Sequence, residues 1–317
     1  MMEYFDSIIV GGGIAGLQAA IQLGRYEHRV LVIDAGAGRS SLCRSYHNLL
    51  GWPDGVSGEE LRSVGRMQAE RLGVVFAKDE VVQAVSKGKL GEGFELWGNS
   101  GKGYEARTLL LATGLMDRMP EITGLKECLG LTVYVCPDCD GYEIRGRRTV
   151  VMGAGNAGAR MALRLRSRTK DLIYVNHENR PVKSELLAEL DLKGIVYIAE
   201  DIQEVMAGED GIMGAVRLGS GKLIETERGF IAFGGNEVKS DLAGQLGAER
   251  MENRHIVTDP RSKMTSVPFV WAAGDVGVHA EQVTIAMGEG SQAAIWMNKA
   301  LQMMKEGANA YQILVRS

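Results

Sequence analysis

At 317 residues the chain is longer than one ordinary hydrophobic core requires, so its length predicts two domains. Hydrophobic residues at 45% and charged residues at 24% are typical of a soluble globular protein, and the formal net charge of −4 offers no basic surface for nucleic acid or an acidic membrane. The N-terminus lacks a positively charged n-region and its apolar run stops at Gly11, so we expect a cytoplasmic protein with no membrane or nucleic-acid partner.

The chain opens with a strand–helix–strand pattern. Residues 7–10 form a short apolar run typical of a buried parallel strand, and residues 14–25 have helical periodicity. Residues 29–33 return to a strand pattern that ends at Asp34. An acid at this position accepts hydrogen bonds from ribose hydroxyls, so we expect Asp34 to bind the adenosine ribose of a dinucleotide.

A Gly-x-Gly-x-x-Gly fingerprint lies between the first strand and the helix. Gly11 permits the tight turn, Gly13 lets the backbone approach a pyrophosphate, and Gly16 allows close packing of helix and strand. Ile14 and Ala15 begin the helix whose N-terminus faces the phosphates. The first part of the chain therefore predicts a dinucleotide site.

Turn-forming residues dominate the next stretch, which includes Asn48, and a helix is predicted over residues 58–72. Residues 108–112 then read as an apolar strand that ends at Thr113 and Gly114, where a cofactor could approach the backbone. Between these lie short β-rich segments at residues 74–76, 81–85 and 94–97.

Cys136 and Cys139 are separated by two residues. Such a pair can close a small disulfide, and a thiolate within it is a good nucleophile. The alternative is half of a zinc site, but zinc needs four ligands, and Cys43 and Cys128 stand alone without a CxxC or HxxxH partner. Because the pair lies between two dinucleotide fingerprints, electron transfer is the favoured interpretation.

The second fingerprint follows the cysteines. Residues 149–152 predict a strand, a helix runs to about residue 166, and residues 172–175 predict another strand. Two fingerprints imply two dinucleotide sites, and electron transfer requires both a donor and an acceptor site. The residues of this fingerprint are Gly153, Gly155, Asn156 and Gly158.

The last part of the chain returns to the first domain. After strands at residues 195–198, 212–218 and 229–233, residues 269–276 predict a buried strand that ends at Gly274 and Asp275. The final amphipathic helix, residues 282–303, begins at Gln282 and Val283, and we expect it to pack on the first domain.

In this order, the motifs resemble those of the low-molecular-weight thioredoxin reductases over essentially the whole chain. The resemblance implies an α/β fold with two Rossmann-like, three-layer ββα domains. Residues 1–117 and 245–317 would form an FAD domain, and residues 118–244 an inserted NAD(P)-type domain that carries the CxxC. A homodimer is expected by analogy. The markers are the two fingerprints, the turn at residues 48–53, Ala112-Thr113-Gly114, Cys136-Pro-Asp-Cys139-Asp140-Gly141 and Gly274-Asp275-Val276 with Gln282 beyond.

The resemblance also assigns roles to single residues. Cys139 would face the flavin, Cys136 would exchange with the substrate disulfide, and Asp140 would move protons, unless Asp140 is only a turn residue. Asp275 would bind the ribityl chain of FAD and Gln282 would lie near its ring system. The residues expected to hold FAD are Gly11, Gly13, Ile14, Ala15, Gly16, Asp34, Asn48, Thr113, Gly114, Gly274, Asp275, Gln282 and Val283.

The sequence departs from the family at two places. Glu178 and Asn179 stand where members that use NADPH carry two arginines for its 2′-phosphate, and a carboxylate repels that phosphate by about 1–4 kcal/mol at 4 Å. Gly158 stands where those members commonly carry alanine. Glu178 suits a free ribose hydroxyl, so the second site is expected to take NADH or a second FAD, or to have lost its nicotinamide role to a ferredoxin-type donor. NADPH is the least favoured donor, although Arg180 could still reach a phosphate.

The second departure is Glu281, where an arginine usually precedes the glutamine, so the charge near the flavin is expected to differ.

The sequence therefore predicts an FAD-dependent disulfide oxidoreductase. Electrons would pass from the flavin through Cys136 and Cys139 to a thioredoxin-like protein or a small disulfide. Two alternatives stay open, a dithiol oxidase that uses oxygen and a non-catalytic redox sensor. The donor, the substrate, the rotation of the domains and the oligomeric state stay open as well.

Overall fold

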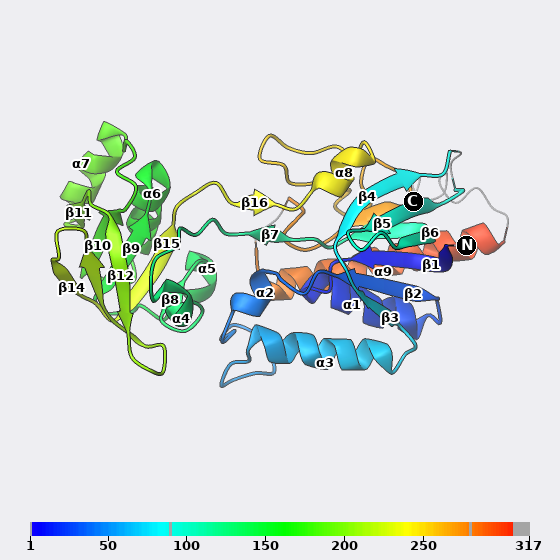
Figure 1. Ribbon diagram of the computed structural model, residues 1–317, viewed down its shortest axis with the longest axis horizontal. Helices are drawn as coiled ribbons and strands as arrows, with labels where there is room; N and C mark the ends of the chain where they lie inside the picture. Colours follow the sequence, from blue (N-terminus) through cyan, green and yellow to red (C-terminus); the bar gives the residue numbers. More distant parts are fainter. Residues whose placement is uncertain (1, 89–90, 279–280, 307–317) are drawn as a thin grey trace. The chain divides into compact units, whose positions relative to one another are not determined.

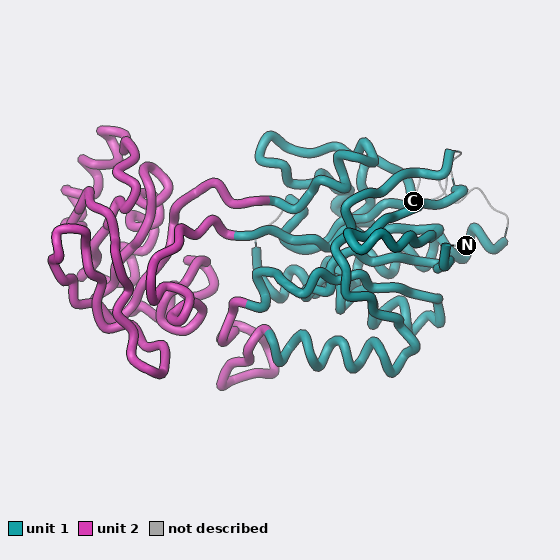
Figure 2. Tube along the Cα trace, viewed as in Figure 1, with its two compact units in different colours: residues 1–41, 59–116, 238–317 teal, residues 42–58, 117–237 magenta. Residues whose placement is uncertain are grey.

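The computed structural model describes residues 2–88, 91–278 and 281–306, which divide into two compact units (Figures 1 and 2). Unit 1 contains residues 1–41, 59–116 and 238–317, and unit 2 contains residues 42–58 and 117–237. Both units are built on parallel strands with helices, which confirms the predicted α/β class. That unit 1 binds FAD and unit 2 a nucleotide remains a prediction.

Unit 1 has a seven-stranded sheet among the described residues, in the order β3-β2-β1-β6-β5-β4 with β17 also paired to β6. Strands β3, β2, β1, β6 and β17 are parallel, whereas β4 and β5 form an antiparallel extension of β6. The parallel strands are rich in buried apolar residues because both faces of the sheet are covered. The bounds are β1 Glu3–Val10, β2 Val30–Asp34, β3 Val75–Lys78, β4 Val81–Ser86, β5 Phe94–Gly98, β6 Gly103–Leu111 and β17 Val270–Ala272.

Two helices far apart in sequence, α1 and α9, pack against each other in unit 1. The final helix runs from Val283 to Lys305, close to the predicted range. Gly290 of α9 has no room for a side chain, because a Cβ there would overlap the carbonyl oxygen of Ala15 in α1. The other helices assigned wholly or partly to unit 1 are α1 Ile14–Arg25, α2 Arg39–Leu42, α3 Gly58–Glu70 and α8 Asp241–Gln245. Short strands β7 Leu115–Met116 and β16 Glu237–Val238 pair where the chain leaves unit 1 and returns to it.

Unit 2 has a five-stranded parallel sheet among its described residues, in the order β11-β10-β9-β15-β8, and a three-stranded antiparallel sheet, β12-β13-β14. One apolar core lies between the two sheets and a second lies under the helices of the parallel sheet. The strands are β8 Val133–Tyr134, β9 Thr149–Gly153, β10 Leu172–Asn176, β11 Val196–Ile198, β12 Ile202–Ala207, β13 Met213–Leu218, β14 Leu223–Glu225 and β15 Arg228–Ala232. The helices are α4 Leu125–Cys128, α5 Pro137–Asp140, α6 Gly155–Leu165 and α7 Ser184–Leu192.

Residues 42–58 belong to unit 2 by their contacts, although the predicted domain boundary places them in the first domain. The Arg44 guanidinium donates a hydrogen bond of 3.1 Å to the carbonyl oxygen of Glu127. Gly130 approaches the same stretch so closely that a Cβ would lie 2.7 Å from the Arg44 nitrogen. Within the described residues, no helix combines the length and the apolar character needed to cross a membrane.

The contact between α1 and α9 can be tested with two glycines of one helix. Gly290→Ala should lower the free energy of unfolding by about 1–3 kcal/mol, because the added methyl group forces α9 away from α1. Gly288→Ala should leave it unchanged or raise it by up to about 1 kcal/mol, because Gly288 is exposed with nothing within 4 Å of its Cβ position. Urea denaturation of both variants measures the difference, and equal effects would contradict the packing.

Candidate functional site

The first fingerprint, at the carboxyl end of β1, has the geometry of an open phosphate-binding turn. Gly11 has a φ of +106°, and a Cβ there would overlap the carbonyl oxygen of Ala112. A Cβ at Gly16 would overlap the carbonyl oxygen of Gly11, so helix and turn pack as predicted. Nothing lies within 4 Å of the Cβ position of Gly13. Helix α1 therefore starts beside open space with no acidic residue in its first turn, which fits a bound diphosphate.

Asp34 ends β2 beside this turn. Its carboxylate accepts a hydrogen bond of 3.1 Å from the Gly12 nitrogen and forms an ion pair of 2.8 Å with Arg62 of α3. The Arg62 guanidinium also donates to the Gly12 carbonyl oxygen at 3.3 Å. Arg62 was not found from the sequence, because an arginine in an amphipathic helix gives no signal of such a contact.

A buried carboxylate binds the backbone of the turn after β17. Glu289 of α9 accepts a hydrogen bond of 3.0 Å from the Gly274 nitrogen and forms an ion pair of 2.9 Å with Lys263. Gly274 has a φ of +79°, and its Cβ position lies 2.9 Å from the Cβ of Ala15. The Gly274 turn, the start of α1 and helix α9 thus meet in unit 1, as the expected FAD residues require. Glu289 was also missed by the sequence interpretation.

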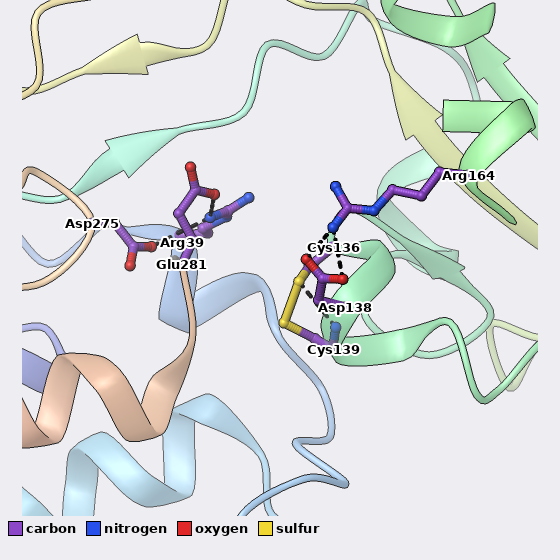
Figure 3. The surroundings of a disulfide bond; sticks show 7 residues. All are labelled: Arg39, Cys136, Asp138, Cys139, Arg164, Asp275 and Glu281. Atoms are coloured by element: carbon purple, nitrogen blue, oxygen red, sulfur yellow. Dashed lines mark hydrogen bonds and ion pairs between the residues drawn. A yellow bond between two sulfur atoms is a disulfide. The ribbon is translucent and has the colours of Figure 1, made fainter. Parts of the chain in front are cut away.

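An arginine accompanies the acidic residues that follow this turn. Arg39 of α2 pairs with Asp275 at 3.3 Å and with Glu281 (Figure 3). The sequence predicts a different charge here because Glu281 replaces an arginine, and the structure places a guanidinium from another element against this carboxylate. Gln282 occupies the N-cap position of α9 and Val283 is its buried first residue.

Three further residues expected at FAD have separate surroundings. Thr113 donates its hydroxyl hydrogen bond to the Lys239 carbonyl oxygen, and the Gly114 carbonyl accepts a bond of 3.0 Å from the Lys239 nitrogen. These contacts join β6 to the returning chain of unit 1. Asn48 is exposed and belongs to residues 42–58 of unit 2, and its role at FAD remains a prediction.

Cys136 and Cys139 form a disulfide with a Cα–Cα distance of 5.3 Å (Figure 3). The pair lies on the short helix α5, where Cys136 is the N-cap residue and Pro137 follows it. The Cys139 nitrogen donates a hydrogen bond of 3.1 Å to Cys136 Sγ. Asp140, directly after Cys139, is half-buried, and its proposed role in proton transfer remains a prediction.

Asp138, one of the two residues between the cysteines, joins them to the helix that follows the second fingerprint. Asp138 pairs with Arg164 of α6 at 2.6 Å, with both side chains more than half exposed. Cys43 and Cys128 are not part of a disulfide, and burial raises the pKa of Cys128. Among the described residues there is no group of three or more His, Cys, Asp or Glu side chains suited to a metal ion.

The second fingerprint, at the carboxyl end of β9, differs from the first at its middle glycine. Gly155 has a φ of +53°, and its Cβ position lies 3.1 Å from the Pro181 carbonyl oxygen and 3.2 Å from Arg180 Cβ. Its nitrogen donates a hydrogen bond of 2.9 Å to the Asn176 side chain. Gly153 and Gly158 pack tightly against β15 and the Tyr174 ring, as their fingerprint positions require. Gly155 is therefore covered, whereas Gly13 is open.

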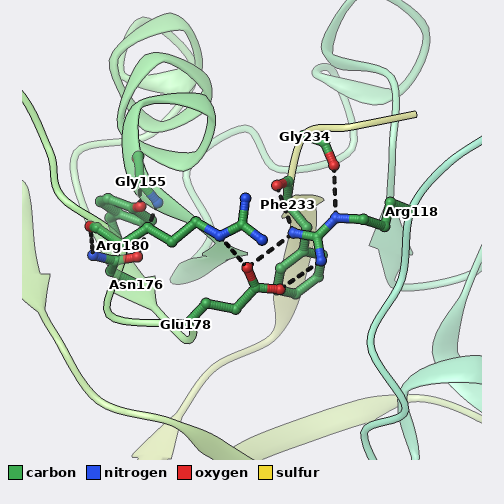
Figure 4. Close-up of polar contacts among 8 residues, drawn as sticks. Arg118, Gly155, Asn176, Glu178, Arg180, Phe233 and Gly234 are labelled. Atoms are coloured by element: carbon green, nitrogen blue, oxygen red, sulfur yellow. Dashed lines mark hydrogen bonds and ion pairs between the residues drawn. The ribbon is translucent and has the colours of Figure 1, made fainter. Parts of the chain in front are cut away.

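Glu178 is already paired with two arginines (Figure 4). The Arg118 guanidinium donates to its two oxygens at 2.7 and 3.0 Å, and Arg180 Nε lies 2.6 Å from one of them. Hydrogen bonds from Arg118 hold the pKa of the Glu178 carboxyl below its ordinary value. Arg118 also donates to the carbonyl oxygens of Phe233 and Gly234, both at 2.8 Å. Arg118 belongs to no motif and was not anticipated.

Comparisons with known proteins agree with this arrangement. The family model described as pyridine nucleotide-disulphide oxidoreductase matches residues 5–290. The chain belongs to this family. It is similar to the thioredoxin reductase of Treponema pallidum (strain Nichols), with 33% identity over 92% of this chain and 95% of that protein. It is also similar to thioredoxin reductase tcpT of Claviceps purpurea (strain 20.1), with 30% identity over 91% of each.

Solved structures give the same result for this disulphide oxidoreductase. The crystal structure of HlmI superposes with a TM-score of 0.85 at 28% identity, covering 98% of this chain and 96% of that chain. The putative thioredoxin reductase TrxB of Bacillus anthracis gives a TM-score of 0.82 at 26% identity, covering 95% and 100%. The predicted two-Rossmann-domain fold and the thioredoxin reductase-like flavoprotein class are confirmed. The family implies FAD and a pyridine nucleotide as cofactors.

His177 of this oxidoreductase, just after β10, supplies a test by pH. Its Nδ1 accepts a hydrogen bond of 2.7 Å from the Ile202 nitrogen, and burial lowers its pKa below the ordinary value of 6.5. The unfolded chain therefore binds this proton at higher pH than the folded chain does. The contribution of His177 to the free energy of unfolding should therefore be constant above pH 6.5. It should be lost as the pH drops below 6.5 and through the lowered pKa of the folded protein.

Thermal denaturation between pH 7.5 and 5.5, a range of about two units around the ordinary histidine pKa, measures this slope. His177→Asn keeps an acceptor for the Ile202 nitrogen and should remove the histidine component of the slope. The exposed His47 serves as the matched control, since His47→Asn should leave the slope in place. A wild-type slope that persists in His177→Asn would contradict the assignment.

Proposed function

We propose that this chain is an FAD-dependent disulphide oxidoreductase in which Cys136 and Cys139 carry electrons between the flavin and a thioredoxin-like protein or small disulfide. The observation that carries the proposal is the disulfide between these two cysteines, positioned on α5 immediately before the second fingerprint. FAD, when bound, supplies a two-electron carrier. The open turn at Gly13, the engaged Asp34 and the Gly274 turn of unit 1 fit this cofactor.

The cysteine pair would act in three balanced steps. Two electrons and two protons open the disulfide to two thiols. The Cys136 thiolate then attacks the substrate disulfide, forming a mixed disulfide and releasing one substrate thiol. Finally, the Cys139 thiolate attacks Cys136 Sγ, which restores the disulfide and releases the second thiol. In the disulfide the Cys139 nitrogen donates a hydrogen bond to Cys136 Sγ, and the same donor would stabilise a negative charge on this sulfur after the disulfide opens. Asp140 would supply and accept the protons.

NADPH is the least favoured electron donor in this proposal. Glu178 holds its negative charge near the place where a 2′-phosphate would be recognised, and its pKa is lowered, so the carboxylate is ionised at neutral pH. NADH, a second FAD or a ferredoxin-type protein are the donors that the sequence leaves. A cytoplasmic location and a homodimer complete the proposal.

A dithiol oxidase is the second candidate, because the paired Glu178 and the covered Gly155 favour a reaction that needs no nucleotide at unit 2. In this reaction electrons would flow in the opposite direction. A substrate dithiol would reduce the Cys136–Cys139 disulfide and become a disulfide itself. Two electrons and two protons would then leave through the flavin to oxygen, giving hydrogen peroxide.

Cysteine variants test the role of the pair. Cys136→Ser and Cys139→Ser should each lower turnover of a small disulfide by at least about 100-fold, because either change prevents disulfide formation between the two positions. Both variants should retain bound FAD, measured by absorbance. Cys43→Ser, at a cysteine outside the disulfide, is the matched control and should keep full turnover. Activity retained in Cys139→Ser would overturn the proposal, as would purified wild-type protein without flavin.

The direction of the reaction can be measured separately. In the reductase, protein reduced with dithionite and freed of reductant should reduce about two thioredoxin disulfides per flavin without oxygen, because the flavin and the cysteine pair each hold two electrons. Dithiols should cause little oxygen uptake. In the oxidase, an oxygen electrode should record about one oxygen molecule consumed per substrate dithiol, in keeping with a two-electron carrier. If the flavin-loaded protein shows neither thioredoxin reduction nor oxygen uptake, the redox sensor becomes the favoured function.

A further inference from the structure

The two fingerprints of this chain provide an internal comparison. Gly13 and Gly155 hold the same position in their fingerprints, the one at which glycine lets the chain approach a pyrophosphate. The space beside Gly13 is open to 4 Å, whereas the backbone of Pro181 and the side chain of Arg180 lie 3.1 and 3.2 Å from the Cβ position of Gly155. The family's pyridine nucleotide therefore does not fit the second fingerprint in this arrangement.

The segment that covers Gly155 comprises residues 178–183 and is called the closing segment. Hydrogen bonds hold it at its middle and at its C-terminal end. The Asn176 side-chain amide donates a hydrogen bond of 2.8 Å to the Arg180 carbonyl oxygen, and the Lys183 nitrogen donates one of 2.9 Å to the side chain of Asn156 (Figure 4 for Asn176). Glu178 adds its ion pairs with Arg118 and Arg180.

Asn176 is central to this closure. Its oxygen accepts the hydrogen bond from the Gly155 nitrogen, and that amide is among those which a bound pyrophosphate would use. Its amide group also donates to the Tyr197 hydroxyl at 3.0 Å, and only 1% of the residue is exposed. One buried side chain thus consumes a phosphate-binding amide and fixes the segment that covers the same glycine.

Arg118 connects the closing segment to the ends of unit 2. Besides Glu178, it binds the carbonyl oxygens of Phe233 and Gly234, which follow β15 where the chain turns back toward unit 1. A dinucleotide whose ribose took Glu178 would have to break the Arg118 pair, and its diphosphate would have to displace Arg180 and Pro181. In the first fingerprint Asp34 is likewise paired with Arg62, but Gly13 is open, so the covering of Gly155 is what sets the second fingerprint apart.

We propose that the closing segment fills the pyrophosphate position of the second fingerprint and that Asn176 is the specificity-determining residue that latches it. The second fingerprint then takes neither NADH, NADPH nor a second FAD. Electrons enter and leave only through the flavin of unit 1 and the cysteine pair, so the redox partners are dithiols, disulfides, oxygen or an electron-carrier protein. The list of redox partners rests on the proposed function, whereas the closure of the second fingerprint is tested by nucleotide binding alone.

The test measures nucleotide binding rather than turnover. FAD-loaded wild-type protein is titrated with NADH and with NADPH by calorimetry, and its flavin is counted per chain after extraction. Wild type should show no binding up to about 1 mM, the weak end of ordinary affinities, and one flavin per chain. The variant Asn176→Ala/Arg180→Gly, which removes the latch and opens the segment, should bind NADH at least about 10-fold more tightly than wild type, as expected for the loss of about two hydrogen bonds.

Two further variants keep the test decisive. Arg180→Gly alone changes a side chain that is 58% exposed, so it should fold even where loss of the buried Asn176 does not, and it should give a smaller gain in affinity. Tyr197→Phe keeps the bonds of Asn176 to Gly155 and Arg180 and should bind no nucleotide. Tight binding of either nucleotide to wild type, or two flavins per chain, would overturn the closure. Folded, flavin-loaded opened variants that gain no affinity would overturn the role of Asn176 and Arg180.

The same experiment separates this inference from the proposed function. If wild type binds no nucleotide but its Cys136 and Cys139 never change redox state with the flavin, the function fails and the closure stands. If wild type binds NADH and reduces disulfides through the cysteines, the closure fails and the function stands.

Discussion

The close backbone contacts that glycine permits are the constraint on which unit 1 depends. Gly16 lets α1 lie against the carbonyl of Gly11, and Gly290 lets α9 lie against Ala15 at the start of the same helix. A side chain at either glycine would separate elements that together leave one open space beside Gly13. The Gly274 turn joins the same cluster through Glu289, whose buried charge is balanced by Lys263. In the proposed function, the open space beside Gly13 takes the pyrophosphate of FAD.

Unit 2 contains the same motif, but the space beside its middle glycine is filled. Gly153 and Gly158 pack as the fingerprint requires, but the middle glycine is covered by the chain that follows β10. The difference comes from Asn176 and Glu178, two polar residues at the end of a buried strand that bind neighbouring parts of the protein. A Rossmann fingerprint therefore specifies a β–α turn, while the residues after the second strand decide whether a ligand can use it.

The cysteine pair lies within unit 2, before the second fingerprint in the sequence. The disulfide is set by local geometry, since α5 brings residues three apart within 5.3 Å, and Asp138 ties this short helix to α6 through Arg164. The exposed ion pair contributes little to stability, but it links the redox pair to the helix of the second fingerprint. In the proposed function, unit 2 acts mainly as a carrier for the cysteines.

The sequence by itself determined the features that depend on residues close together in the chain. The two strand–turn–helix motifs, the spacing of Cys136 and Cys139, and the identity of Asp34 and Glu178 are all visible there, because fingerprints and turns are fixed by local backbone requirements. These sufficed for the fold class and the family.

Only the tertiary structure showed which distant side chains complete the sites. Arg62 at Asp34, Glu289 at Gly274, Arg118 at Glu178 and the attachment of residues 42–58 to unit 2 join positions that are 15 to 83 residues apart in sequence. No periodicity or motif marks such partners, since an arginine or glutamate on a helix has the same pattern whether it faces solvent or a buried carboxylate. Long-range ion pairs and the covering of Gly155 are consequences of how the elements pack, and that is why the sequence named Asp34 and Glu178 but neither the arginines that pair with them nor Glu289.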